Sequence, residues 1–296
     1  MKNDFQDSFL KSIEDTEHEI SSKPNSSIDK RPKISIVIPL YNEEKTIKKV
    51  LKKIPNDPYY EIIVVDDGSI DNGIKKITEL NDNRIRIISH STNIGYGAAI
   101  KTGVKYSCGE IVVTIDSDGQ HDPSDISKLI KPIIQDKADL VIGSRYLGNC
   151  CYKVPLYTRL GESVINLVLR LLFRQKVKNN QSGLRAFKKE NDYILERLKN
   201  KGMGFTTEML FQSGFNKLRI KEIPITVFPR KFGVSYVNLI KIVKSISFCI
   251  TRFLFKKLFS TLFKSVISLK KSWSNLISPI SFFNKKKAND SFKVNL

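Results

Sequence analysis

Short apolar runs alternate with amphipathic stretches along most of the chain after residue 33. Five of these runs are predicted to be β-strands, and the first of them has the nearly continuous apolar character of a buried strand. The five runs are residues 34–40, 61–65, 84–88, 110–115 and 139–143. The stretches between them repeat their apolar positions at helical spacing. Strands that alternate with helices are typical of βαβ units, so the pattern predicts an α/β fold with a mainly parallel central sheet flanked by helices.

Polar residues indicate where several helices begin. Asn42 is a candidate N-cap, and Glu43 and Glu44 would then lie in the first turn of the helix that follows. Asp122 followed by Pro123 predicts another helix start, with proline at the first helical position.

Two segments beyond the fifth strand also show a regular pattern. Residues 218–228 are strand-like, and residues 155–175 predict a helix with an apolar stripe, which is interpreted as core packing or a partner surface. The stripe consists of Val164, Leu167, Val168, Leu171 and Leu172.

The two ends of the chain differ from the α/β region, which is expected to form a folded domain over residues 32–237. Residues 1–31 are polar, lack the apolar segment of a signal peptide, and predict a flexible arm. Residues 238–296 interleave apolar residues with lysines, and their charge-free runs are shorter than the roughly 20 residues of a membrane-spanning helix. This pattern favours amphipathic helices at a membrane surface, with packing on the domain or on a second copy as the alternative. The residues concerned are Phe248, Phe253, Phe255, Phe259, Leu262 and Phe263, with Lys241, Arg252, Lys256, Lys257 and Lys264.

The chain is strongly basic, because 50 Lys and Arg residues stand against 30 Asp and Glu and give a formal net charge of +20. This excess predicts anionic partners such as phosphates, nucleic acid or an anionic membrane. Residues 223–289 contain no Asp or Glu, so much of the excess lies near the C-terminus. A hydrophobic content of 41% excludes a disordered polyelectrolyte. The four cysteines match no zinc-binding spacing and are expected to be reduced thiols.

Polar clusters follow the predicted strands at the ends where ligands bind in parallel sheets. Asp66 and Asp67 follow one strand, and Asp116-Ser117-Asp118-Gly119-Gln120 follows another. Two carboxylates and an amide oxygen are hard ligands that suit Mg²⁺ or Mn²⁺. A polar turn in which Asp122 caps a helix is the alternative, and the second acidic pair favours the metal site.

The motifs, taken together, resemble those of the family 2 nucleotide-sugar glycosyltransferases, which have the GT-A fold. They are Pro39-Leu40-Tyr41-Asn42-Glu43, Val65-Asp66-Asp67-Gly68-Ser69, Asn93-x-Gly95-x-Gly97-Ala98 and the DxD motif Asp116-Ser117-Asp118-Gly119-Gln120-His121. Within that family the chain is similar to the dolichyl-phosphate, or polyprenyl-phosphate, hexose synthases. That closer match is carried by Gly143-Ser144-Arg145-Tyr146, Ser182-Gly183-Leu184-Arg185-Ala186-Phe187 and Pro224-Ile225 with Arg230-Lys231-Phe232-Gly233-Val234-Ser235. The resemblance spans about residues 34–236.

The resemblance implies a role for each matching residue. The residues expected to bind the nucleotide sugar are Pro39, Tyr41, Glu43, Asp66, Asp67, Asn93, Gly95, Gly97 and Asp116. The residues expected to coordinate the divalent metal are Asp116, Asp118 and Gln120. The residues expected to bind the acceptor phosphate are Arg145, Ser182, Arg185, Arg230 and Lys231. The residues expected to be catalytic are Asp118, Arg145 and Arg185. Glu208 lies where relatives often place an acidic residue, and no role is assigned to it.

The resemblance implies metal-dependent, inverting transfer of mannose, glucose or N-acetylglucosamine from GDP-mannose, UDP-glucose or UDP-N-acetylglucosamine to a polyprenyl phosphate. The product would be a lipid-phosphate sugar donor for glycan assembly. The metal would neutralise the diphosphate leaving group. A phosphate monoester has a second pKa of about 6 and is largely a dianion at neutral pH, so the acceptor needs cations rather than a base. Arginines supply such cations as planar bidentate donors.

The same reading places the protein on the cytoplasmic face of a membrane as a peripheral or monotopic enzyme, with a membrane partner subunit or a second copy as further partners. One alternative is transfer to a saccharide or protein hydroxyl, for which Glu208 or Asp122 would be the base. Another is a nucleic-acid binder that uses the basic tail. That hypothesis leaves the strand-end carboxylates unexplained, so no nucleic-acid partner is expected.

Overall fold

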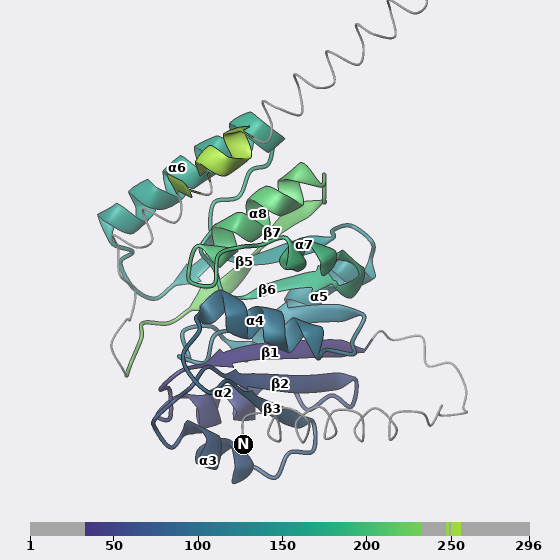
Figure 1. The fold of residues 1–296 in the computed structure, drawn as a ribbon, viewed down its shortest axis with the longest axis vertical. Helices are drawn as coiled ribbons and strands as arrows, with labels where there is room; N and C mark the ends of the chain where they lie inside the picture. The colour runs from purple at the N-terminus through teal and green to yellow at the C-terminus, as the bar shows by residue number, and fades with distance from the viewer. Residues whose placement is uncertain (1–32, 233–246, 249, 256–296) are drawn as a thin grey trace, which may run out of the picture. The chain divides into compact units, whose positions relative to one another are not determined.

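The computed structural model describes residues 33–232, 247–248 and 250–255. Its centre is a seven-stranded sheet with the strand order β3-β2-β1-β4-β6-β5-β7 (Figure 1). The strands are β1 (Ile34–Leu40), β2 (Tyr60–Asp66), β3 (Ile85–Ser89), β4 (Ile111–Thr114), β5 (Leu140–Cys150), β6 (Arg185–Lys188) and β7 (Ile220–Val227). The five strands predicted from apolar runs and the strand-like segment 218–228 are all present, so the α/β prediction is confirmed.

One strand was not predicted. β6 lies between β4 and β5 and runs antiparallel to both, whereas β1 pairs in parallel with β2 and β4, β2 with β3, and β5 with β7. The sheet is therefore mainly parallel with one reversed strand. β6 has only four residues, which is too few to show a strand period in the sequence.

Helices cover both faces of this sheet. They are α2 (Ile47–Lys53), α3 (Gly73–Thr78), α4 (Tyr96–Lys105), α5 (Ile126–Ile134), α6 (Leu156–Phe173), α7 (Tyr193–Glu196) and α8 (Phe205–Phe215), with short 3₁₀ turns at Pro123–Asp125 and Lys189–Asn191. Successive residues of β1 point to opposite faces. Ile36 and Ile38 accordingly join a core cluster with α2 and α5, and Val37 joins one with α4, α6 and α8. Burial on both faces explains why β1, β2 and β4 are almost continuously apolar.

The predicted helix start at Asn42 is wrong. α2 begins five residues later, at Ile47. Asn42 adopts a left-handed backbone with a φ of 54°, its side-chain oxygen accepts a hydrogen bond from the Ile70 N–H at 2.9 Å, and its own N–H donates to Ser69 at 3.0 Å. Asn42 thus ties two strand-end loops together instead of capping a helix. The start at Asp122 and Pro123 is confirmed, since the Asp122 carboxylate accepts from the Ser124 N–H at 3.1 Å.

The helix predicted at 155–175 is confirmed as α6, but its stripe is not a core surface. The side chains that α6 buries are Glu162, Ile165 and Leu169. Most of the large apolar side chains on its other side are more than half exposed, and they are Leu156, Tyr157, Leu160, Val164, Leu167 and Leu171. Within the predicted stripe, Val168 packs against the core, while Val164, Leu167 and Leu171 face outward.

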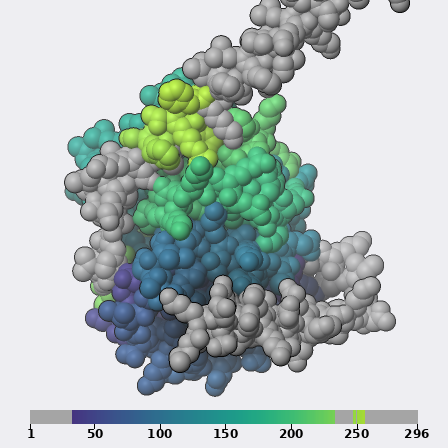
Figure 2. All heavy atoms as spheres, viewed as in Figure 1, coloured from purple at the N-terminus to yellow at the C-terminus, as the bar shows by residue number. Residues whose placement is uncertain are grey.

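A short piece of the basic tail packs on the domain. Phe253 is only 2% exposed, and its ring lies 5.5 Å from that of Phe211 and 6.4 Å from that of Phe173. Figure 2 shows the yellow-green atoms of this helical segment against the green part of the surface. The prediction that Phe253 lies at a membrane interface is therefore wrong. Phe248 and Phe255 of the same piece are exposed, and the rest of the tail and the arm 1–31 lie outside the described residues.

Candidate functional site

A pocket of about 300 Å³ opens at the carboxyl ends of the central strands. Eight of the predicted site residues line it, namely Pro39, Tyr41, Glu43, Asp67, Asn93, Asp116, Asp118 and Arg230. Leu40, Tyr96, Ala99, Ser117, Gly202 and Met203 complete the lining. The other predicted residues do not line it, and these are Asp66, Gly95, Gly97, Gln120, Arg145, Ser182, Arg185 and Lys231.

Asp67 holds one wall of the pocket in place. Its carboxylate accepts hydrogen bonds from the N–H groups of Ile94 and Gly95, at 3.0 and 2.8 Å, and lies 2.8 Å from Nδ1 of His90. These contacts fix the loop that carries Asn93. Asp66 does not line the pocket, is 3% exposed and accepts from the Ser69 N–H at 3.1 Å.

Gly95 and Gly97 allow a second loop to come close. The carbonyl of Lys201 accepts a hydrogen bond from the Gly97 N–H at 2.6 Å, and a Cβ on Gly95 would lie 2.5 Å from the same oxygen. This approach brings Gly202 and Met203 to the pocket. The two glycines thus shape the pocket through the loop they admit. The sequence around Gly202 and Met203 carries no signal of this role.

The acidic motif after β4 presents two carboxylates to the pocket. Oδ1 of Asp116 is buried and has no hydrogen-bond partner among the described residues. A Cβ on Gly183 would lie only 2.0 Å from Oδ2 of Asp116, so the backbone leaves room for this carboxylate and little else. Burial raises the pKa of Asp116, and the nearby charge of Asp118 adds to the rise, whereas His121 opposes it. A buried carboxylate oxygen without a donor is suited to a cation.

Gln120 is turned away from these carboxylates. Its side-chain amide donates to the Phe228 carbonyl at 3.2 Å, and its N–H donates to Asp118 at 3.0 Å. In the part of the chain that the structure describes, no cluster of three or more His, Cys, Asp or Glu side chains could hold a metal ion. Two carboxylates still fit Mg²⁺ or Mn²⁺, since such ions usually retain waters and bind substrate phosphates.

Arg230 brings a positive charge to the same pocket from the segment after β7. Its guanidinium contacts the Glu43 carboxylate and lies 3.5 Å from Oδ2 of Asp118. Burial raises the pKa of Glu43, and the charge of Arg230 opposes that rise. Lys231, the next residue, lines an adjoining pocket of about 140 Å³, which shares Asp118 with the first pocket and which Lys45, Lys49 and Lys53 also line.

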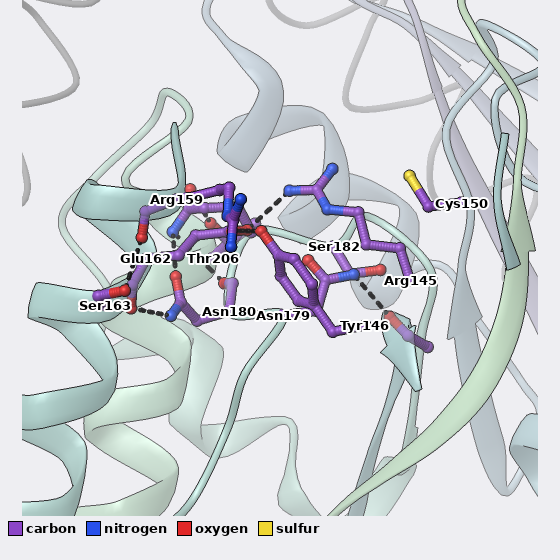
Figure 3. Close-up of polar contacts among 12 residues, drawn as sticks. Arg145, Tyr146, Cys150, Arg159, Glu162, Ser163, Asn179, Asn180, Ser182 and Thr206 are labelled. Carbon is purple, nitrogen blue, oxygen red and sulfur yellow. Dashed lines mark hydrogen bonds and ion pairs between the residues drawn. The ribbon is translucent and has the colours of Figure 1, made fainter. Parts of the chain in front are cut away.

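Arg145 lies in a polar cluster between the end of β5 and α6, shown in Figure 3. Its guanidinium donates to the Glu162 carboxylate at 2.7 Å and to the Tyr152 hydroxyl at 3.0 Å. The Tyr146 hydroxyl donates to the other oxygen of Glu162. Burial raises the pKa of Glu162, and the charge of Arg145 opposes this. Nε of Arg145 is buried without a hydrogen-bond partner in the described residues, so the cluster leaves this donor unused.

Arg185 lies inside the domain and not on a binding surface. It is 2% exposed and donates to the carbonyls of Asn180, Ser182 and Thr206 at 2.8, 2.8 and 3.0 Å. Burial lowers its pKa to about 10. These bonds tie the loop before β6 to the start of α8. The present contacts of Arg185 therefore serve the architecture of the site, and the sequence alone could not distinguish this from a phosphate contact.

The two candidate bases for a hydroxyl acceptor are engaged elsewhere. Asp122 caps the turn after the acidic motif and lies 3.8 Å from Lys53. Glu208 is 2% exposed, accepts from the N–H groups of Lys199 and Asn200 at 3.0 and 2.8 Å, and pairs with Arg252 at 2.6 Å. Neither side chain lines the 300 Å³ pocket.

Comparison with known proteins supports the family expected from the motifs. Residues 35–195 match the model of glycosyl transferase family 2. The UDP-N-acetylglucosamine–dolichyl-phosphate N-acetylglucosaminyltransferase of Methanococcus voltae is 39% identical over 221 residues, which cover 68% of this chain and 88% of that protein. The dolichol-phosphate mannosyltransferase of Pyrococcus furiosus is 32% identical over 212 residues, which cover 69% of this chain and 58% of that protein.

The fold is also found among solved structures. Glucosyl-3-phosphoglycerate synthase from Mycobacterium tuberculosis, crystallised with Mn²⁺, UDP-glucose and phosphoglyceric acid, superposes with a TM-score of 0.59 at 22% identity. The match covers 78% of this chain and 86% of that one. The expected GT-A architecture is thereby confirmed. Taken with the sequence matches, it shows that the chain belongs to glycosyl transferase family 2.

Proposed function

We propose that this protein transfers a hexose from a nucleotide sugar to a polyprenyl or dolichyl phosphate in a metal-dependent reaction that inverts the anomeric centre. The observation that carries the proposal is the 300 Å³ pocket, in which Tyr41, Asp67 and Asn93 lie beside Asp116 and Asp118. Named relatives at 39% and 32% identity transfer sugars to dolichyl phosphate, which supports the choice of acceptor. The relative with the higher identity makes UDP-N-acetylglucosamine the first donor to test, before GDP-mannose and UDP-glucose.

The nucleoside would bind against Pro39, Tyr41, Glu43 and the Asn93 loop. Asp66 would hold the turn at Ser69, and Gly95 and Gly97 would admit the loop that carries Gly202 and Met203 on the other side of the pocket. Asp116 and Asp118 would hold Mg²⁺ or Mn²⁺, and Gln120 would join them after its amide leaves the Phe228 carbonyl. When bound, the metal neutralises charge on the diphosphate leaving group.

The acceptor phosphate would bring its own nucleophile. One of its oxygens forms a bond to the anomeric carbon while the bond from that carbon to the nucleoside diphosphate breaks, and no proton has to be removed from a dianion. The two anions must be brought together by fixed cations. We assign this task to Arg145, Arg230 and Lys231, with Asp118 beside the reacting groups. Arg185 and Ser182 act from within, by shaping the loop before β6.

We further propose that the protein associates with the cytoplasmic face of a membrane as a peripheral protein. The exposed apolar side chains of α6 lie together along one helix, whereas exposed apolar residues on an ordinary surface are isolated. Phe248 and Phe255 add to this exposed apolar surface. None of the described helices is long and apolar enough to cross a bilayer. Free thiols at Cys108, Cys150 and Cys151 are consistent with a reducing compartment. A membrane partner subunit or a second copy could share this surface.

A transfer assay tests the reaction. Purified protein with Mg²⁺ or Mn²⁺ is given each of the three labelled nucleotide sugars and a short polyprenyl phosphate. We expect metal-dependent label in the organic phase from one donor, and no label with a chelator or with Asp118→Ala. Label in a saccharide or a protein instead of the lipid would overturn the proposed acceptor. Absence of any metal-dependent nucleotide binding would overturn the proposal as a whole.

A further inference from the structure

Gly202 and Met203, which form one wall of the pocket, lie in the loop directly before α8. The loop at residues 199–203 is held by hydrogen bonds at three places. At its C-terminal end, the Gly202 carbonyl accepts from the Phe205 N–H at 3.1 Å and the Met203 carbonyl accepts from the Thr206 hydroxyl at 3.0 Å. On the pocket side, the Lys201 carbonyl accepts from the start of α4. On the far side, the N–H groups of Lys199 and Asn200 both donate to one oxygen of Glu208, at 3.0 and 2.8 Å. The position of the wall therefore depends on the first turn of α8 and on where the Glu208 carboxylate in that turn lies.

Glu208 is itself held by a residue from the C-terminal part of the chain. It lies in the first turn of α8 and is 2% exposed. Its second oxygen accepts a hydrogen bond from Nη1 of Arg252 at 2.6 Å. The described interactions of this carboxylate are thus two backbone amides and one guanidinium. A carboxylate buried to this degree is strongly disfavoured when its cation is removed.

Arg252 is delivered by the helical piece that Phe253 anchors. The Phe253 ring packs between those of Phe173 in α6 and Phe211 in α8. Arg252 is the neighbour of this buried residue, so its side chain reaches Glu208 only while the piece is docked. Figure 1 shows this piece, in yellow-green, beside α6. A segment that begins 35 residues after the end of α8 thereby completes the support of the pocket wall.

We propose that Arg252 and Glu208 are positioning residues for the donor pocket, through which residues 250–255 set the affinity for the nucleotide sugar. The identity of the ligand as a nucleotide sugar rests on the proposed function. The link from Arg252 through Glu208 to Gly202 and Met203 does not depend on it. Neither side chain touches the pocket, so the effect runs through Gly202 and Met203. The expected signature is a selective change in donor binding, with little change in the rate at saturation or in the use of the lipid acceptor.

The test compares full-length variants by steady-state kinetics and by calorimetric titration with UDP and with GDP in the presence of Mg²⁺. Arg252→Gln should raise the KM for the nucleotide sugar by up to about tenfold, because the loss of Arg252 can weaken donor binding by at most the free energy of one hydrogen bond to a buried charge. The kcat and the KM for polyprenyl phosphate should change by less than about twofold in this variant, because the chemistry and the acceptor site are untouched. Arg252→Lys should recover part of the affinity. Lys137→Gln, at an exposed lysine in the turn after α5, is the matched control and should behave as wild type.

A double-mutant cycle separates positioning from simple loss of stability. Glu208→Gln should weaken nucleotide binding in parallel, and the double variant should be no worse than the poorer single variant, since both changes break one link. Circular dichroism at the assay temperature confirms that each variant is folded. Unchanged donor KM in Arg252→Gln, or equal effects on donor and acceptor, would overturn this inference. Wild-type protein that binds neither nucleotide would instead contradict the proposed function, so the two failures are distinguishable.

Discussion

At the scale of single residues, the candidate metal site depends on a glycine that the sequence motif contains but does not explain. Gly183 lies in the loop before β6, far along the chain from the acidic motif. Its missing side chain makes the space for the Asp116 carboxylate, because a Cβ there would lie 2.0 Å from Oδ2. The Thr114 hydroxyl donates to the Gly183 carbonyl at 2.8 Å, which fixes that backbone beside β4.

We therefore expect Gly183→Ala to displace Asp116 and weaken binding of Mn²⁺ together with UDP by roughly tenfold or more. Titration calorimetry with and without the metal measures this directly. Gly161→Ala is the matched control, since nothing lies within 4 Å of a Cβ at that position. In α6 the added methyl group should raise stability by up to about 1 kcal/mol and leave binding unchanged. Wild-type affinity in Gly183→Ala would contradict the assigned role of Asp116.

The candidate site could be predicted from the sequence in part, and the reason lies in how each residue contributes. Tyr41, Asp67 and Asp118 follow strands, and the strand ends converge by the geometry of a parallel sheet. Arg145 and Arg185 carry the right charge in the right motifs. Whether such a charge faces a ligand depends on tertiary partners, here Glu162 for Arg145 and three carbonyl groups for Arg185. Those partners come from distant segments with no motif of their own.

At the scale of elements, the strands with strong apolar runs could be predicted from the sequence, whereas the antiparallel strand β6 could not. β6 is inserted between β4 and β5 because its backbone completes both ladders. Its four residues carry no strand signal without those neighbours. The loop after β1 shows the same limit. Asn42 is a residue type that often caps helices, but here it forms hydrogen bonds with Ser69 and Ile70 of another loop.

The β5–β7 end of the sheet carries an ion-pair network that predicts a pH dependence. Arg219, directly before β7, donates to Asp136 and to Asp139 at the start of β5, in each case at 2.7 Å. Hydrogen bonds to Arg219 lower the pKa of both carboxyl groups, with help from Lys188. A lowered pKa means that the stabilisation is present above the ordinary aspartate pKa of about 3.9 and is lost as the pH falls below it.

Arg219→Ala should therefore lower the melting temperature at pH 6 by about 1–2 °C, a small effect because the network is largely exposed. The difference from wild type should shrink as the pH falls from 4 toward 2, where the carboxylates become protonated in both proteins. Differential scanning calorimetry across this range makes the measurement. A difference that grows toward low pH would show that the network does not act through these aspartates.

At the scale of the whole molecule, the described domain has one side suited to water and one that is not. α6 buries Ile165 and Leu169 and leaves Leu160, Val164 and Leu167 exposed, which is unfavourable for a helix facing only solvent. The residues after position 222 add positive charge without any Asp or Glu until residue 290. Apolar surface and positive charge together are what an anionic lipid surface binds.

We expect the protein to sediment with vesicles that contain phosphatidylserine, and less so as salt is raised, because added ions screen the charges. Leu160→Glu combined with Leu171→Glu should abolish or strongly reduce this binding. Each change places a carboxylate where an apolar side chain, 60% and 71% exposed, would enter the lipid. Nucleotide binding in the absence of lipid should stay as in wild type, since neither residue contacts the pocket.

The decisive comparison is with Ile134→Glu, which changes an exposed isoleucine of α5 in the same way. If hydrophobic surface in general drove vesicle binding, Ile134→Glu would weaken that binding to a similar degree as Leu160→Glu alone. If α6 is the docking surface, Ile134→Glu will sediment like wild type. In that case the ion pair of Arg145 with Glu162, which is buried on the inner side of α6, would connect the lipid-facing helix to a residue proposed to bind the acceptor phosphate. Equal loss in the α5 and α6 variants would remove α6 from the proposed membrane surface and with it this connection.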